Sequence, residues 1–340
     1  MNNESTDPRH PVGTTRHLKV GISISDRMLP LLTGQVTSPE ITLDFECGRP
    51  NELFWQALHN DAFDLTEMSL AAHAILTSRG ENPFVGLPVF TSRMFRHGSI
   101  FVSAASNITT PEGLSGRRVG IPEYQMTAAV WMRGILQERH GVAPADIHWV
   151  TGGVNKPGRK ERIALRLPQN IHVEPIAAQA TLNDLLLAGE IDAIIAPQIP
   201  QALQLGDQRI QPLFDDSRKV EEAYFAETKT FPIMHLAVLR QELAATEPQL
   251  PATLFRLCDA AKGQAMDTLH DTDAPYVMLP WQADEAARTC TVMGQDYWPY
   301  GIDANRHVLE TFIRYLGEQT LLARPIEVDE LFAPGPYTAP

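Results

Sequence analysis

Two arginines and a histidine fall within the short segment Arg93–His97, and aromatic side chains flank them. Arginine binds carboxylates through two parallel N–H groups, a geometry that lysine cannot reproduce. Arg93 and Arg96, with His97 beside them, could therefore form a pocket for a planar anion. The alternative is a surface turn in which both arginines pair with acidic residues elsewhere in the chain. We favour the pocket.

Histidines supply the candidate acid–base groups, because their side chain titrates nearest to neutral pH. His235 ends the segment Phe231–His235, where we expect the floor of a cleft, and His307 opens a helix that follows Trp298–Gly301. A purely structural role is the alternative for each of them. No HxH or HExxH spacing is present, so a metal site could form only from residues distant in sequence.

The elements that must position these residues come in two similar sets. The short strands Leu18–Ile22 and Arg117–Ile121 resemble each other and lie far apart in the chain. Each is followed later by an Asp-bearing segment, Phe63–Met68 or Ile191–Ala196, that comes after a capped amphipathic helix. Strands that alternate with helices indicate βαβ units. We therefore predict an α/β fold of two lobes, each a mainly parallel sheet flanked by helices, around a ligand cleft.

Helix-capping residues support these elements. Pro50–Asn51 marks the start of a helix in the first set. In the second set, Thr181 and Asp184 have the spacing of a capping box, and Gly189 is placed to end the same helix. The segment Thr151–Asn170 is rich in Gly, Pro and basic residues, which predicts a long surface loop.

The chain is expected to cross between the lobes twice, near Ser103–Ser106 and near Thr230–Pro232. Two crossings would let the lobes hinge around a ligand. The predicted division is a disordered lead-in (1–17), a discontinuous first lobe (18–104 and 231–333), an inserted second lobe (105–230) and a flexible tail (334–340).

Polar side chains gather at turns that should face the cleft. Ligands of open α/β sheets bind beyond the carboxyl ends of the strands, beside helix N-termini. A threonine at a helix start, such as Thr127, is more commonly only a cap, but here several polar residues share the turn. The side chains offered by these turns are Ser25, Asp26 and Arg27; Glu67 and Ser69; Glu123, Tyr124, Gln125 and Thr127; and Pro197 and Gln198.

The composition excludes several classes of protein. With 28 basic and 41 acidic residues, the net charge of −13 argues against an extended nucleic-acid-binding surface. No apolar run is long enough to span a membrane, and Walker A, GxGxxG and GxSxG motifs are absent. The three cysteines form neither a zinc motif nor a disulfide framework. The polar segment 1–17 lacks the apolar core of a secretion signal, so we expect a cytoplasmic protein.

Several long motifs stand out along the chain: Glu67–Leu70, Ser92–His97, Gly120–Trp131, His148–Gly153, Phe231–His235 and Trp298–Gly301. Together, and in this order, they resemble the 4,5-dihydroxyphthalate decarboxylase family, and the likeness runs from about Leu18 to Phe332. The resemblance implies a type 2 periplasmic-binding-protein-like fold used for catalysis, in a homo-oligomeric carboxy-lyase of bacterial phthalate degradation. Its product would be protocatechuate, 3,4-dihydroxybenzoate.

The substrate that this resemblance implies, a catechol with two adjacent carboxylates, sets the roles of the binding residues. Its pocket needs cations for the carboxylates and hydrogen-bond partners for the hydroxyls. As hypotheses, Arg93 and Arg96 hold the carboxylates, assisted by amides at the helix start Gln125–Thr127. The other predicted substrate-binding residues are Ser69, Tyr124, Gln125, Thr127, Arg27 and His307.

Catalysis is expected to proceed by protonation of the ring carbon that bears the leaving carboxylate. The hydroxyl para to that carbon supplies electron density, especially when a base removes its proton. His235 or His97 is the predicted proton donor, and Glu67 or Glu123 polarises a hydroxyl. No organic cofactor and no metal ligand set is expected, because the phenol acts as the electron sink. A divalent metal chelated by the catechol is left open.

Two other functions fit the same fold. A solute-binding protein for an aromatic carboxylate would bind its ligand in the cleft without catalysis, but such a protein needs an export signal or a lipid anchor. A related enzyme could act on another hydroxylated aromatic acid, and a screen of substrates would separate the two. A pure interaction module is disfavoured, because the polar residues converge on a cleft rather than on an exposed apolar patch.

Overall fold

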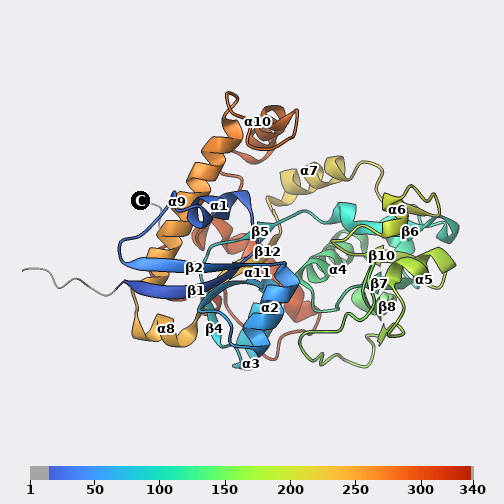
Figure 1. Ribbon diagram of the computed structural model, residues 1–340. Coiled ribbons are helices and arrows are strands. Elements are labelled where there is room, and N and C mark those ends of the chain that lie inside the picture. Colours follow the sequence, from blue (N-terminus) through green and yellow to red (C-terminus); the bar gives the residue numbers. More distant parts are fainter. Residues whose placement is uncertain (1–14, 338–340) are drawn as a thin grey trace, which may run out of the picture.

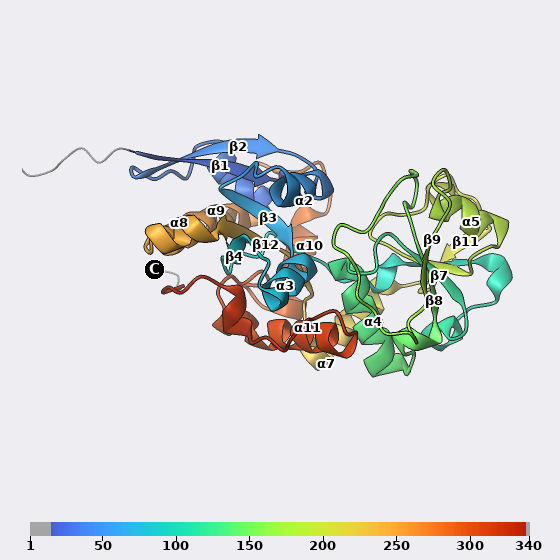
Figure 2. The same ribbon diagram turned by 90° about the horizontal axis from the view of Figure 1, so that it is seen from below.

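Two β-sheets organise the chain, and the computed structural model describes them within residues 15–337 (Figure 1). The sheets lie in two lobes, which are well separated in the view from below (Figure 2). Helices flank both sheets. The two-lobed α/β architecture that the repeated strand pattern predicts is therefore confirmed.

The first sheet has the strand order β2-β1-β3-β12-β4, and β5 also pairs with β12. Strands β2, β1 and β3 are parallel, whereas β12 runs antiparallel to β3, β4 and β5. The chain thus returns from the second lobe directly into the middle of this sheet. The strands are β1 (Arg16–Ile22), β2 (Ile41–Cys47), β3 (Leu65–Ser69), β4 (Phe84–Gly86), β5 (Ser92–Arg93) and β12 (Ile233–Arg240).

The second sheet has the order β11-β6-β10-β7-β8-β9. Strands β10, β7, β8 and β9 are parallel to their neighbours in this run, and β6 is antiparallel to both β10 and β11. The strands are β6 (Ile100–Ser103), β7 (Arg118–Ile121), β8 (His148–Thr151), β9 (Val173–Pro175), β10 (Ala193–Ile195) and β11 (Ile210–Pro212).

Each sheet is mixed, although the sequence predicts mainly parallel sheets. The antiparallel strands β12 and β6 are the ones next to the crossings between the lobes. Antiparallel neighbours need no crossover helix, so a chain that enters from the other lobe can pair at once. The structure also places β6 in the second sheet, whereas the sequence division at residue 104 assigned Ile100–Ser103 to the first lobe.

The helices begin and end at residues suited to those positions. The Thr181 hydroxyl accepts a hydrogen bond from the Asp184 N–H at 3.1 Å, which is one of the two bonds of the predicted capping box, whereas the Asp184 carboxylate accepts from the Thr181 hydroxyl at 2.7 Å rather than from the Thr181 N–H. Gly189 ends that helix with a φ of 73°, a conformation that favours glycine. The helices are α1 (Leu29–Leu32), α2 (Pro50–His59), α3 (Leu70–Arg79), α4 (Thr127–His140), α5 (Leu182–Ala188), α6 (Gln201–Gln204), α7 (Ser217–Thr228), α8 (Gln241–Thr246), α9 (Leu250–His270), α10 (Gln282–Met293) and α11 (Arg306–Glu318).

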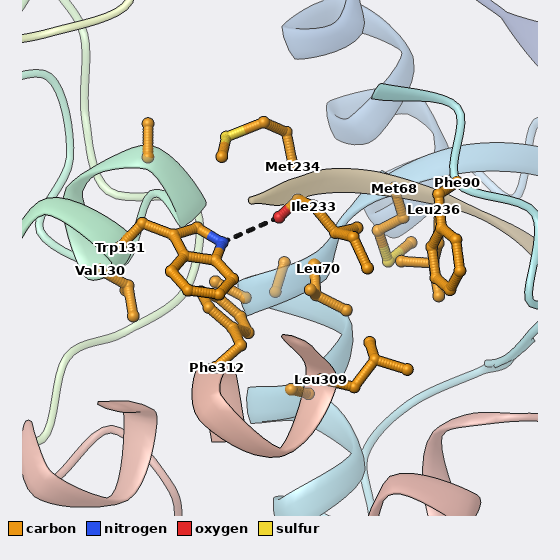
Figure 3. Packing of buried hydrophobic residues seen from close by; sticks show 14 of the residues in the cluster. Met68, Leu70, Phe90, Val130, Trp131, Ile233, Met234, Leu236, Leu309 and Phe312 are labelled. Atoms are coloured by element: carbon orange, nitrogen blue, oxygen red, sulfur yellow. Dashed lines mark hydrogen bonds between the residues drawn. The ribbon is translucent and has the colours of Figure 1, made fainter. Parts of the chain in front are cut away.

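The hydrophobic core joins the two lobes through α4. The indole of Trp131 on α4 donates a hydrogen bond of 3.0 Å to the carbonyl of Ile233 on β12 (Figure 3). Its ring packs against Phe312 of α11, with the ring centroids 5.1 Å apart. The C-terminal helices thus reach both lobes: α9 packs on α1 in the first lobe, and α11 packs on α4.

A buried arginine fixes the turn between β7 and α4. Arg133 is 1% exposed and donates to the Tyr124 carbonyl at 2.7 Å and to the Gln319 side chain at 2.8 Å. Its guanidinium also stacks on the Tyr124 ring, 3.8 Å from the ring centre. A buried charge is tolerated only when it is paired or hydrogen-bonded in this way. Arg133 therefore fixes the position of the turn that carries Glu123–Thr127.

The two ends of the chain extend only partly into the described range. Of the predicted disordered lead-in, residues 1–14 lie outside that range, and Arg16 and His17 belong to β1. Of the predicted flexible tail, residues 338–340 lie outside it, whereas the Tyr337 hydroxyl donates to the Ala333 carbonyl at 2.6 Å. Among residues 15–337, no helix has the length and the apolar character needed to cross a bilayer.

Candidate active site

A cavity of about 240 Å³ lies between the two lobes. Strands β3, β7 and β10 end beside it, which is where open α/β sheets bind their ligands. The first lobe contributes Pro50, Asn51, Phe54, Ser69, Met234 and His235, with Arg96 from the segment after β5. The second lobe contributes Pro122, Met126, Thr127, Ala128, Arg159, Arg162, Pro197 and Gln198.

His235 and Glu67 lie side by side at the first-lobe side of this cavity. They lie on the adjacent strands β12 and β3, and Nδ1 of the histidine is 3.4 Å from Oε2 of the glutamate. The imidazole also packs edge-on against Phe54, with the ring centroids 4.9 Å apart. Because Nδ1 faces Glu67, Nε2 is the nitrogen that can reach a ligand in the cavity.

Glu67 is buried but ionised. Its carboxylate accepts the Ser23 N–H at 2.9 Å and the Thr91 hydroxyl at 3.3 Å. Burial acts to raise the pKa of Glu67, but the nearby His235 ring and the hydrogen bond from the Ser23 N–H hold it below the usual value. A fixed negative charge behind the imidazole orients that ring and balances the positive charge of an imidazolium.

Hydroxyl groups from both lobes meet at the floor of the cavity. The Ser69 and Thr127 side-chain oxygens are 2.8 Å apart, across the gap between β3 and the start of α4. The Thr127 hydroxyl also accepts the Ala71 N–H at 3.1 Å. These contacts bring the N-terminus of α4 to the ligand space, where it favours negative charge.

Two arginines enter the cavity from the long loop between β8 and β9. Arg159 donates to Glu123 Oε1 from Nε at 2.9 Å and from Nη2 at 2.6 Å. Arg162 donates from Nε to Glu123 Oε2 at 2.9 Å, and the Gln125 amide donates to the same oxygen at 2.7 Å. Glu123 is therefore the buried anchor of both arginines, and Gln125 supports it.

Arg96 is the third cation of the cavity. It is 9% exposed, and its guanidinium makes no hydrogen bond to any residue in the described range. Burial lowers the pKa of Arg96 to about 10, and the charge of Glu221 opposes that shift, so the group stays charged at neutral pH. An unpaired, buried cation is costly, and an anionic ligand would relieve that cost.

The other two predicted cations of the binding site are used elsewhere. Arg93 donates to the carbonyls of Phe231 at 3.2 Å and Pro299 at 2.8 Å, and it is not among the residues that line the cavity. Arg27 donates to the Thr91 carbonyl at 2.8 Å and also lies outside the lining. Backbone carbonyls attract both side chains into the first lobe.

The remaining predicted residues lie away from the cavity lining. Tyr124 is fully buried beneath Arg133. His307 lies on α11, and its Nε2 is 2.9 Å from the carbonyl of Lys229, the residue that follows α7. His97 belongs to a second, separate hollow beside Tyr224, and burial, with the charges of His140 and Arg139, lowers its pKa to about 4.

Sequence reasoning missed Arg159 and Arg162. They lie in Thr151–Asn170, which is a long loop as the sequence predicts but is not entirely on the surface, because Thr151–Val154 and Ile163 are buried. Long loops without regular structure are commonly functional, and the basic residues in this one were the available signal. Among residues 15–337, no group of three or more His, Cys, Asp and Glu side chains is arranged to hold a metal ion.

Glu161, on the same loop, makes stability depend on pH. Burial, together with the charge of Glu123, raises the pKa of Glu161 from 4.5 to about 7, against the effect of a hydrogen bond from the Tyr124 N–H. The folded state therefore binds more protons than the unfolded chain between these values, and stability falls as pH rises through that window. We expect Glu161→Gln to remove this loss, so that the variant exceeds the wild type in unfolding free energy at pH 8 by on the order of 2 kcal/mol. Denaturant unfolding at pH 5 and pH 8 measures it, and equal pH slopes in both proteins would contradict the assignment.

Comparisons with known proteins show the family to which the chain belongs. A curated 4,5-dihydroxyphthalate decarboxylase from Comamonas testosteroni is 37% identical over 317 residues, covering 93% of this chain and 96% of that protein. The chain belongs to the 4,5-dihydroxyphthalate decarboxylase family. This is a family of carboxy-lyases, and a second member, from Pseudomonas putida, is 36% identical over 200 residues, or 59% of this chain and 78% of that protein. No protein-family model matches the chain.

Solved structures show the fold of this decarboxylase family member. The periplasmic aliphatic sulphonate binding protein of Escherichia coli superposes with a TM-score of 0.52 at 11% identity, over 94% of this chain and 98% of that one. The alkanesulfonate-binding protein of Xanthomonas axonopodis pv. citri gives 0.52 at 14% identity, over 93% and 97%. The predicted periplasmic-binding-protein-like fold is confirmed. At these identities the likeness concerns the fold alone.

Proposed function

We propose that this protein decarboxylates 4,5-dihydroxyphthalate to protocatechuate and CO2 in the cleft between its lobes. The observation that carries the proposal is a cavity that combines an imidazole backed by a buried carboxylate with three arginines, in a chain 37% identical to a named decarboxylase of that substrate. A role in bacterial phthalate degradation, a cytoplasmic location and assembly as a homo-oligomer are part of the same proposal.

The proposed chemistry is a proton transfer to carbon. His235, as the imidazolium, donates its Nε2 proton to the ring carbon that bears the leaving carboxylate. The hydroxyl para to that carbon feeds electron density into the ring, which stabilises the cation-like intermediate. The bond from the ring to the carboxylate then breaks, CO2 leaves, and its electron pair restores aromaticity. Each turnover consumes one proton, and Glu67 keeps the imidazole oriented for the next one.

The other residues of the cavity bind and orient the substrate in this proposal. The cations Arg96 and Arg162 suit the carboxylates, because a guanidinium meets a carboxylate through paired N–H groups. Ser69 and Thr127 suit the hydroxyl groups. Glu123 is occupied by two arginines, so it is not assigned as the base that polarises a hydroxyl, the role that the sequence suggests for Glu67 or Glu123.

An ultraviolet assay of the purified protein with 4,5-dihydroxyphthalate tests this function. We expect protocatechuate to appear at the rate at which the substrate disappears. A parallel assay with a chelator tests for a catechol-bound metal, since loss of activity that added metal restores would reveal one. Tight binding without turnover would instead favour the solute-binding function, which the fold shares. The absence of both turnover and binding would refute the proposed substrate.

A further inference from the structure

Glu123 supports the cavity wall but does not itself contact the cavity. The residue is 1% exposed and does not line the cavity, whereas both arginines that it binds do. Arg159 takes Oε1 through two nitrogens, and Arg162 takes Oε2 through Nε. The carboxylate is therefore saturated by protein donors and has no free lone pair with which to act on a substrate.

Glu123 binds Arg159 and Arg162 unequally, so part of the Arg162 guanidinium is left without a hydrogen bond. Arg159 spends its fork on Glu123 and also donates to Asn51 across the cleft at 3.1 Å. Arg162 is anchored to Glu123 through Nε, and its Nη1 group is buried without a hydrogen-bond partner among residues 15–337. Its guanidinium is further held over the Phe54 ring, 5.2 Å from the ring centre. Arg162 thus keeps unused donor capacity at a fixed place in the cavity lining.

The net charge of the cavity lining also favours an anionic ligand. Two guanidinium groups share the single Glu123 carboxylate, which leaves about one net positive charge on this side of the cavity. The nearby Glu161 carboxyl has a raised pKa of about 7 and compensates only in part. Arg96 supplies a second cation that lacks a hydrogen-bond acceptor among the described residues. The cavity therefore offers two separate donor sets for anions, one held by the long loop and one by the segment after β5.

We propose that Glu123 is a positioning residue that fixes Arg162, so that Arg162 and Arg96 each bind one of two adjacent carboxylates on an aromatic ring. The site would then select ortho-dicarboxylates over monocarboxylates. This inference rests on the proposed function, because it assigns the carboxylates of that substrate class. It differs in placing the origin of selectivity in a residue that never touches the ligand.

The test uses phthalate, which carries both carboxylates but no hydroxyls, and benzoate, which carries one carboxylate. Calorimetry gives the Kd of each for the wild type, Glu123→Gln and Glu123→Asp. Glu174→Gln is the matched control, because Glu174 pairs with Arg118 on the surface of the same lobe. We expect Glu123→Gln to weaken phthalate binding by at least about tenfold and benzoate binding by less than about threefold. Glu123→Asp should restore part of the loss, and Glu174→Gln should change neither.

Kinetics with 4,5-dihydroxyphthalate give the second readout. A positioning role predicts that Glu123→Gln raises KM more than it lowers kcat, because the chemistry at His235 is left intact. Equal weakening of phthalate and benzoate, or phthalate binding within about twofold of the wild type, would overturn the inference. If Glu123→Gln does not fold, Arg162→Lys is compared instead, and retained selectivity for phthalate would likewise overturn it. Wild-type protein that binds no phthalate and turns over no substrate would refute the proposed function itself.

Discussion

His235→Gln is expected to lower kcat for 4,5-dihydroxyphthalate by about 10²- to 10⁴-fold, the range that a well-placed acid–base group contributes. Glutamine keeps a polar side chain of similar reach but cannot deliver a proton to a ring carbon. The loss should appear in kcat more than in KM, because the carboxylates are bound by arginines on other elements. Steady-state kinetics, with protocatechuate formation as the signal, measure it.

Two other histidines provide controls for this variant. His307→Gln removes a side chain of α11 whose Nε2 faces the Lys229 carbonyl at the end of α7, and we expect its kinetics to match the wild type. His97→Gln tests the competing donor, which lies in a separate hollow. Near-normal turnover by His235→Gln, or a loss confined to His97→Gln, would remove His235 from the mechanism.

Arg96→Gln is expected to lower kcat/KM for the same substrate by on the order of a hundredfold. Removing one partner of a buried, hydrogen-bonded charge pair costs a few kcal/mol, much of it because the other charge is left unpaired. Since Arg96 has no hydrogen-bond acceptor among the described residues, that lost partner would be the substrate. The variant should fold as well as the wild type, or better, because it buries one unpaired charge fewer.

Arg118→Gln is the matched control for Arg96→Gln. Arg118 lies on β7 and pairs with Glu174 at 2.9 Å, with about half of its side chain exposed. Surface pairs of this kind contribute little, so its kcat/KM and its melting temperature should stay close to those of the wild type. Comparable losses in both arginine variants would point to a general charge effect rather than to a carboxylate-binding role for Arg96.

Local sequence signals predicted the elements that frame the cleft. The strands expected at Leu18–Ile22 and Arg117–Ile121 are β1 and β7, within two residues at each end. The Thr181 cap and the Gly189 stop are both present at α5. These features depend on neighbouring residues alone, because capping and alternation are local effects. The placement of β6 depends instead on pairing with strands distant in sequence, and no local pattern records that pairing.

The sequence could not separate Arg93 from Arg96. Both stand in one short basic segment, and either could have reached a ligand. Arg93 lies on β5 opposite Ile233, where backbone carbonyls of distant segments capture its guanidinium. Arg96 follows after the strand has ended and lines the cavity. Carbonyl acceptors far away in the chain therefore determine that Arg96, and not Arg93, is available to a ligand.

Arg159 and Arg162 could not be predicted as site residues for a related reason. Nothing in Thr151–Asn170 has the period of a helix or strand, so the sequence gives no direction for its side chains. Their positions follow from Glu123, which lies on the other side of β8 in sequence and attracts both guanidinium groups. His235 and Glu67, by contrast, were both candidates from sequence, and the pairing of β12 with β3 brings them together.

Decarboxylation in deuterium oxide tests the central claim most directly. Purified protein is mixed with 4,5-dihydroxyphthalate in D2O, and the products are followed by nuclear magnetic resonance and by CO2 release. We predict one CO2 for each protocatechuate formed, with a single deuteron at the ring position that lost its carboxylate. Substrate that is bound but recovered unchanged, or a product without deuterium at that carbon, would contradict decarboxylation by ring protonation in this cleft.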